Sequence, residues 1–157
     1  MKELYVVSYD DSGGKDVHLQ LQRQIQKLND YLLQRNIEKI LSHSVLFALQ
    51  FVDPVVKRFR IPVLINAHFC TNSVPLLHSI AASFEEELLA SHSPVVFVMT
   101  KQATMALFQY IDPFFLKKEW TDTGALELFH IVCEADHIGV ERVWQPFSPV
   151  PTDLGKR

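Results

Sequence analysis

The chain has 157 residues, of which 48% are hydrophobic and 21% charged, and its formal net charge is −3. This composition is typical of one globular domain with a buried core, and the negative balance argues against nucleic-acid binding, which needs a clustered basic face. Because there are only two cysteines and no apolar run approaches the about 18 residues of a membrane span, we expect a cytoplasmic protein with neither a disulfide framework nor a membrane partner.

Four short runs are apolar without alternation, at residues 4–7, 38–41, 61–65 and 95–99. Such runs are typical of strands that are covered on both faces, as in a parallel sheet. Apolar residues spaced by three and four predict helices between the strands, over 21–32, 49–59 and 77–88, and we expect a fourth helix over 101–111. Since Pro54 lies within the second helix, we expect a kink there or a restart with Asp53 as cap.

The last third of the chain changes character. The segments "ALELFHIVC" and "IGVERVWQ" flank "EADH", which predicts two antiparallel strands joined by a turn. The expected fold class is therefore α/β, a three-layer α/β/α sandwich with a mostly parallel central sheet and antiparallel C-terminal strands. We expect one domain over 1–145 and an extended, proline-containing tail over 146–157.

Ligands of such sheets bind beyond the carboxyl ends of the strands. These ends predict four loops to inspect, at 8–11, 42–44, 66–69 and 100–102. Polar and charged side chains in the loops are candidates to line a binding site: Asp10, Asp11, Ser42, His43, His68 and Lys101.

The order of these segments resembles one known family. "LYVVSYDDS" (4–12) is similar to the family's "LYLVRHGET", and residues 37–63 follow its "IDAIYSSPLxRAxQTAxPLAxxLGIPV" pattern, with Gln24 at the place of the glutamine in "GxxQA". "VVFVMTKQATMALFQYI" (95–111) resembles "VLVVSHGGVIxALLxYL", and "TGALELF" (123–129) resembles "NGAVTVLEF". Over about residues 3–130 the chain therefore resembles the histidine phosphatase superfamily, the phosphoglycerate-mutase-like proteins.

In that family two arginines and two histidines form one phosphate pocket, and the first histidine attacks phosphorus. The resemblance places the first arginine at Ser8 and this histidine at Tyr9. It places the second arginine at Phe47 and the second histidine at Thr100. All four positions are substituted, so the resemblance implies a divergent member that lacks the catalytic residues.

Elementary electrostatics agrees with that implication. A buried phosphate exchanges its hydration for charge-assisted bonds, and arginine is preferred because it binds with two parallel hydrogen bonds. Asp10 and Asp11 add negative charge to the turn, and Lys101 is the one nearby cation that the sequence suggests. A tyrosine has an ordinary pKa of about 10 and needs an activating group to act as a nucleophile, so Tyr9 is a poor substitute for histidine.

We therefore expect a catalytically inactive protein that acts as a binding or regulatory module without a cofactor. Its partner would be a protein, a small ligand or a second copy of the chain. The contact would use the altered pocket or the aromatic-rich segment 110–120.

Two alternatives stay open. The first is a hydrolase of another kind, using metal-assisted chemistry through Asp10, Asp11 and His43, although the histidines lack the short spacing of a metal-binding helix. The second is a structural subunit in which Phe47 and Tyr9 fill the volume vacated by arginine and histidine.

Overall fold

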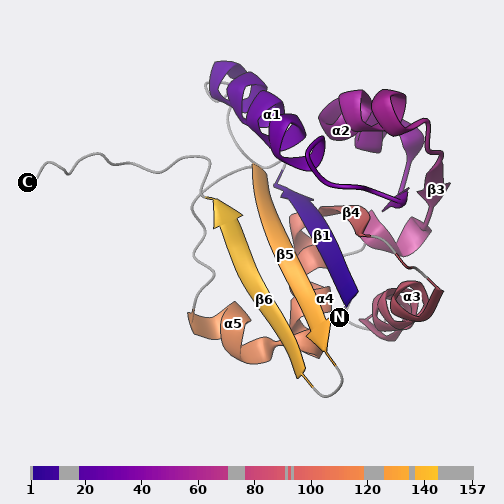
Figure 1. Ribbon diagram of the computed structural model, residues 1–157. Helices are drawn as coiled ribbons and strands as arrows, with labels where there is room; N and C mark the ends of the chain where they lie inside the picture. The colour runs from indigo at the N-terminus through magenta and orange to yellow at the C-terminus, as the bar shows by residue number, and fades with distance from the viewer. Residues whose placement is uncertain are drawn as a thin grey trace, which may run out of the picture.

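The computed structural model describes residues 2–10, 18–70, 77–90, 92, 94–118, 126–134 and 137–144. Asp11 and the predicted tail over 146–157 lie outside these residues. The described part contains a six-stranded sheet of order β3-β2-β4-β1-β5-β6 (Figure 1). The parallel strands are β1 (Lys2–Tyr9), β2 (Lys39–Ser42), β3 (Val63–Ile65) and β4 (Val95–Thr100), and the antiparallel ones are β5 (Leu126–Glu134) and β6 (His137–Trp144).

Helices cover both faces of the sheet. The two on one face are α1 (His18–Leu32) and α2 (Val45–Phe59). On the other face lie α3 (Leu77–Ala90), α4 (Lys101–Ile111) and α5 (Pro113–Lys118), with a short 3-10 helix, η2 (Ala67–Cys70), after β3 (Figure 1). The predicted three-layer fold class is confirmed. Within the described residues, none of the helices combines the length and the apolar character needed to cross a membrane.

Strand β1 shows why the apolar runs do not alternate. Leu4 and Val6 lie in the core under α3 and α4, whereas Tyr5 and Val7 lie in the core under α1 and α2. All four are at most 2% exposed. A central strand with helices on both sides is buried on both faces, which requires apolar residues at consecutive positions.

Helix α2 breaks in its middle, as Pro54 predicts. The non-helical residue is Val52, at φ −127° and ψ 24°, one position before the expected cap Asp53. Proline has no N–H to donate to the preceding turn, and its ring collides with that turn's carbonyl. At the break, the Asn29 side-chain amide of α1 donates to the Phe51 carbonyl at 2.7 Å. This buried hydrogen bond ties α1 to the kink.

Strands β1, β5 and β6 are linked across one face by His130. Its Nε2 lies 2.8 Å from a Glu3 carboxylate oxygen and its Nδ1 lies 3.1 Å from one of Glu141. The ring stacks on Tyr5, with 4.7 Å between centroids. Glu141 is the register partner of His130 in the β5–β6 hairpin, whereas Glu3 lies 127 positions away, so the contact with Glu3 depends on the tertiary fold.

Candidate functional site

Tyr9 and Thr100 lie side by side at the carboxyl ends of β1 and β4, where they are partners in the parallel register. Thr100 also begins α4, and its hydroxyl accepts a hydrogen bond from the Ala103 N–H at 3.3 Å. Its carbonyl accepts from the Thr104 hydroxyl at 2.8 Å. The Thr100 side chain therefore serves as the helix N-cap, a role that threonine fills well.

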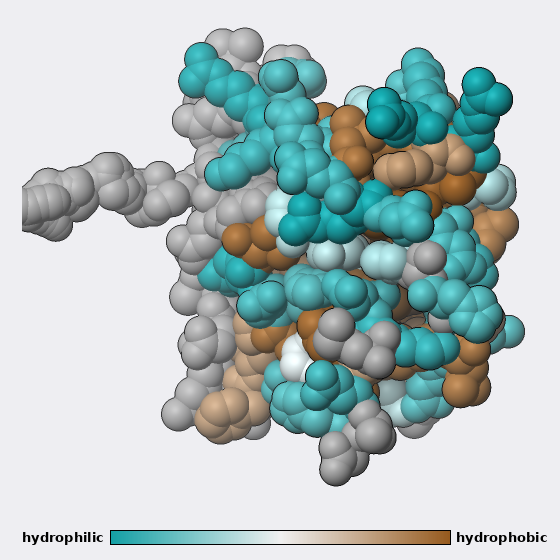
Figure 2. Space-filling model, viewed as in Figure 1, coloured by the Kyte–Doolittle hydropathy of each residue, from teal (hydrophilic) through white to brown (hydrophobic). Residues whose placement is uncertain are grey.

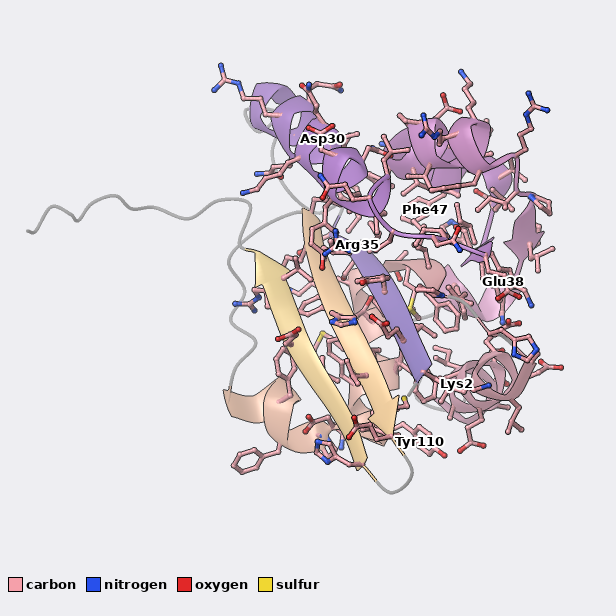
Figure 3. All side chains as sticks on the ribbon, viewed as in Figure 1. Lys2, Asp30, Arg35, Glu38, Phe47 and Tyr110 are labelled. Atoms are coloured by element: carbon pink, nitrogen blue, oxygen red, sulfur yellow. The ribbon has the colours of Figure 1, made fainter. Side chains whose placement is uncertain are left out.

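Tyr9 packs against the first half of α2. Its ring centroid lies 4.8 Å from that of Phe51 and 6.4 Å from that of Phe47. Phe47 in turn lies 5.3 Å from Phe51 and 4.4 Å from the ring of His43. We call these four side chains, Tyr9, His43, Phe47 and Phe51, the aromatic cluster. Phe47 lies on the side of the sheet that α1 and α2 cover (Figure 3).

The start of α2 explains how Phe47 reaches this position. Ser44 is the N-cap, and its hydroxyl accepts from the Phe47 N–H at 3.0 Å. This cap fixes the first turn of the helix, so Phe47 and Phe51, four residues apart, lie on the same face. Phe51 is not among the residues that the sequence predicts for the site. Its spacing from Phe47 was the available signal.

His43 lies between β2 and α2 with its ring against Phe47. Its Nδ1 is buried, and no residue in the described part of the chain forms a hydrogen bond with it. Burial lowers the pKa of His43 because the charged imidazolium is poorly solvated there. The neutral ring is therefore favoured, which suits an aromatic neighbour better than an anionic ligand.

The electrostatics of the site centres on one ion pair. Lys101 Nζ lies 3.6 Å from Asp10 Oδ2, and the two side chains are only 15% and 18% exposed. At this distance the attraction is that of two charges, because it exceeds the range of a hydrogen bond. The cation that the sequence suggested for the site thus already faces a carboxylate.

Two other predicted residues contribute less. Ser42 is fully buried at the end of β2, and its hydroxyl has no hydrogen-bond partner among the residues with described positions. The backbone of His68 lies in η2, but its side chain is outside the described part. Across the described ranges, no three histidine, cysteine or acidic residues are grouped as ligands for a metal ion.

Ser8 occupies a different environment from Tyr9. It is 2% exposed and lies opposite Glu127 in the β1–β5 register. The Glu127 carboxylate lies 3.1 Å from Arg142 Nε of β6, with side-chain exposures of 3% and 12%. A buried acidic group therefore lies beside the residue that the resemblance aligns with an arginine.

Segment 110–120 is divided between surface and core. Tyr110 and Phe114 are 44% and 67% exposed, and the Tyr110 hydroxyl donates to Glu85. Phe115 is buried, with its ring edge-on to Phe108 and Phe129. Residues 119 and 120 lie outside the described part. Among the aromatic side chains described in this segment, Tyr110 and Phe114 are therefore exposed and Phe115 belongs to the core.

Comparison with solved structures places this geometry in a known fold. A phosphoglycerate mutase from Plasmodium falciparum matches with a TM-score of 0.63 and 9% identity, over 98% of this chain and 97% of that one. A mycobacterial glucosyl-3-phosphoglycerate phosphatase, solved with VO3, matches with a TM-score of 0.60 and 14% identity, over 92% and 99%. A protein described as mycobacterial hydrolase 1 matches with a TM-score of 0.55, the same identity and the same coverage.

The chain has the phosphoglycerate-mutase-like fold. No family model matches the sequence, and no curated protein matches it either. At 9% to 14% identity, the structural neighbours show the fold alone. Within this phosphoglycerate-mutase-like fold, the strand-end site consists of the aromatic cluster, the Asp10–Lys101 ion pair and the helix cap Thr100.

Proposed function

We propose that this protein is a catalytically inactive relative of the histidine phosphatases, a single domain that acts in the cytoplasm as a binding or regulatory module. The observation that carries the proposal is the aromatic cluster. The two positions that the resemblance aligns with the nucleophilic histidine and the second arginine hold Tyr9 and Phe47, and their rings pack with Phe51. At these two positions the side chains therefore offer neither a nucleophilic nitrogen nor a guanidinium.

The charge of the site supports the same proposal. A phosphate monoester carries up to two negative charges and loses hydration when it binds, so it needs several fixed cations. Lys101 already faces Asp10 at 3.6 Å, and an incoming phosphate would meet the carboxylate as well as the ammonium. Two unit charges about 4 Å apart interact by roughly 4 kcal/mol at an effective dielectric constant of about 20. Repulsion from Asp10 therefore offsets attraction to Lys101.

The direct test is turnover of a generic phosphomonoester such as p-nitrophenyl phosphate by purified protein. We expect no hydrolysis above buffer and no phosphorylated side chain at Tyr9. Turnover that copurifies with the protein, disappears in Tyr9→Phe and persists in the matched exposed variant Tyr110→Phe would overturn the proposal.

A binding test separates loss of chemistry from loss of ligand recognition. Vanadate was present in the structure of the related mycobacterial phosphatase, so it is a suitable probe of a phosphate site. We expect vanadate to leave the thermal unfolding midpoint of this protein unchanged, because a ligand raises the midpoint only if it binds the folded state. A rise that saturates with vanadate and is lost in Lys101→Ala would contradict the expected loss of anion binding.

The metal-dependent alternative predicts a different result. It requires Asp10, Asp11 and His43 to hold a cation, and Asp11 lies outside the described residues. Elemental analysis of untagged protein decides between the two: stoichiometric zinc or manganese that is lost in Asp10→Ala would favour the hydrolase. The inactive module predicts substoichiometric metal that Asp10→Ala does not change.

A further inference from the structure

Part of the β5–β6 hairpin has a face that lies outside the cover of the described helices. Figure 1 shows α1 and α2 toward the top of the view, while β5 and β6 face the viewer without a helix in front of them. This face carries a hollow of about 340 Å³. Its volume lies at the lower end of the range typical of binding pockets, about 300–1,000 Å³. In the space-filling view, hydrophilic residues gather over these strands (Figure 2).

The strand register explains how this β5–β6 hollow forms. Three consecutive cross-strand pairs line it: His130 with Glu141, Val132 with Gly139, and Glu134 with His137. Directly opposed residues of an antiparallel pair place their side chains on the same face of the sheet. Because Gly139 has no side chain, the middle pair leaves a gap between two polar pairs.

One wall of the hollow is held in place by its neighbours. The His130 side chain is only 16% exposed and its ring stacks on Tyr5. The two ring nitrogens lie 2.8 Å and 3.1 Å from carboxylate oxygens of Glu3 and Glu141. A side chain restrained in this way has little freedom left to lose, so the ordering cost of binding a ligand against it is small.

The fixed charges at the hollow are negative. Glu134 and Glu141 belong to the two outer pairs, and both are exposed. Among the described residues that line the hollow there is no lysine or arginine. Between the outer pairs, Val132 offers an apolar surface where Gly139 leaves room. Lysine and arginine side chains have the complementary construction, an apolar stem that ends in a cationic head.

We propose that the β5–β6 hollow binds lysine or arginine side chains from a basic segment of a partner protein. The stem packs over Gly139 against Val132, and the cationic head reaches Glu134 or Glu141. The hollow is open toward solvent, whereas pockets for free small ligands enclose most of the ligand surface. A protein segment instead inserts one side chain and rests on the surrounding surface.

A second copy of this chain is a poor occupant. A twofold contact through this face would bring the same glutamates against each other, and juxtaposed like charges disfavour association. The inference goes beyond the proposed function, because the hollow lies apart from the strand-end site. Binding at the hollow would persist even if the protein hydrolysed phosphomonoesters, so the two proposals fail independently.

Binding is measured by fluorescence anisotropy with a fluorescein-labelled octalysine peptide at neutral pH and low salt. We expect saturable binding that weakens with added sodium chloride, because salt screens exposed charges. Glu134→Gln combined with Glu141→Gln should weaken binding by about three- to tenfold, since each exposed ion pair contributes modestly. The matched pair, Asp30→Asn with Glu86→Gln, removes two charges at exposed positions on α1 and α3 and should change the affinity by less than about twofold.

A change of shape without a change of charge tests the hollow itself. Gly139→Val fills the gap, and a Cβ there would lie 3.4 Å from Nε2 of His137, an exposed side chain that can move aside. We expect binding to weaken by at least about threefold, because the added bulk excludes the stem. Circular dichroism verifies folding, and the charge variants decide alone if Gly139→Val does not fold. Unchanged binding by folded Gly139→Val, equal effects of the two charge pairs, or no binding up to about 1 mM peptide would overturn the proposal.

The competing occupant is the basic end of the chain itself. Lys156 and Arg157 lie outside the described residues. If they filled the hollow, replacing both with glutamine would remove a competitor and tighten peptide binding. We expect the affinity to stay the same. A gain of more than about twofold would assign the hollow to the chain's own residues and contradict a partner protein as the occupant.

Discussion

Lys101 and Asp10 face each other across the ends of β4 and β1, with 3.6 Å between Nζ and Oδ2. The pair is mostly shielded from water, at 15% and 18% exposure, so salt screens it less than a surface pair. Lys101 is the cation that the sequence suggested for the site, and Asp10 is one of the two acidic residues expected to repel phosphate there. Replacing the Asp10 carboxylate alone separates its repulsion of phosphate from the attraction that Lys101 provides.

Asp10→Asn removes the negative charge and keeps the shape. We expect the affinity for phosphate, which in the unchanged protein is too weak to shift the unfolding midpoint, to rise by about three- to tenfold, because a single partly exposed charge pair is worth on the order of 1 kcal/mol. Line broadening in ³¹P spectra during titration with inorganic phosphate measures this. The control Asp30→Asn makes the same change of net charge at an exposed position on α1. Equal effects of the two variants would show that only net charge matters.

Introducing an arginine and a histidine at the two positions on β1 should not produce catalysis. We expect Ser8→Arg combined with Tyr9→His to give no phosphatase activity, because Phe47, Thr100 and the acidic turn remain. An arginine at Ser8 would also enter a position that is 2% exposed and opposite Glu127. The measurement is hydrolysis of p-nitrophenyl phosphate, with circular dichroism to verify folding. Easy recovery of turnover by these two changes would show that the remaining residues matter less than their charges suggest.

The stability of the protein should depend on His43 in mildly acidic solution. Burial lowers the pKa of His43 in the folded state, so the unfolded chain binds the proton more readily. The free energy of unfolding therefore rises with pH near the ordinary histidine pKa of about 6.5. The stability that neutral His43 contributes is present above this pH and is lost as the pH falls from there toward the lower pKa of the folded state. His43→Leu should reduce this slope by a fraction of the one-proton limit of about 1.4 kcal/mol per pH unit.

Urea unfolding between about pH 5 and pH 7.5 measures that slope. The matched variant is His92→Leu, which changes an exposed histidine. If His92→Leu reduces the pH dependence as much as His43→Leu does, burial of His43 is not the cause.

The buried pair of Glu127 and Arg142 should be costly to break from one side. Arg142→Met leaves the carboxylate, at 3% exposure, without its cation. Loss of one partner of a buried pair typically destabilises a protein by about 3 kcal/mol or more. Combining it with Glu127→Leu should recover most of that loss, since an apolar pair can replace a buried ion pair.

An exposed ion pair provides the comparison for this experiment. Lys57 and Asp53 are 2.9 Å apart on α2, with side chains 77% and 37% exposed. Lys57→Met should cost less than about 0.5 kcal/mol in urea unfolding, because solvent screens such pairs. Similar losses for Lys57→Met and Arg142→Met would mean that burial of the Glu127 pair contributes little.

The pattern of apolar residues in the sequence predicted the positions of most helices and strands. Helix α3, at 77–90, agrees almost to the residue with the apolar spacing over 77–88, because one face of the helix packs on the sheet, and α4 has the expected bounds 101–111. Strand β1 is longer than its apolar run, at 2–9 instead of 4–7. Its polar ends are held by backbone pairing with β4 and β5, which hydropathy does not report.

The site was predictable only in part. The rule that strand ends meet at one sheet edge brought Tyr9 and Thr100 together correctly. The tie from Asn29 to Phe51 joins residues 22 positions apart and has no local pattern that would reveal it. The partner of Glu127 on β6 is similarly hidden, since side chains that meet across strands follow from register rather than composition.

The aromatic cluster makes the strand-end site part of the protein's interior framework. Phe51 is fully buried, and Tyr9 and Phe47 pack against the same core as α1 and α2. Truncating a buried phenylalanine typically costs about 3–5 kcal/mol, a large share of the stability of a small domain. Substitutions that open the strand-end site to water are therefore expected to cost folding stability as well as to change the chemistry of the site.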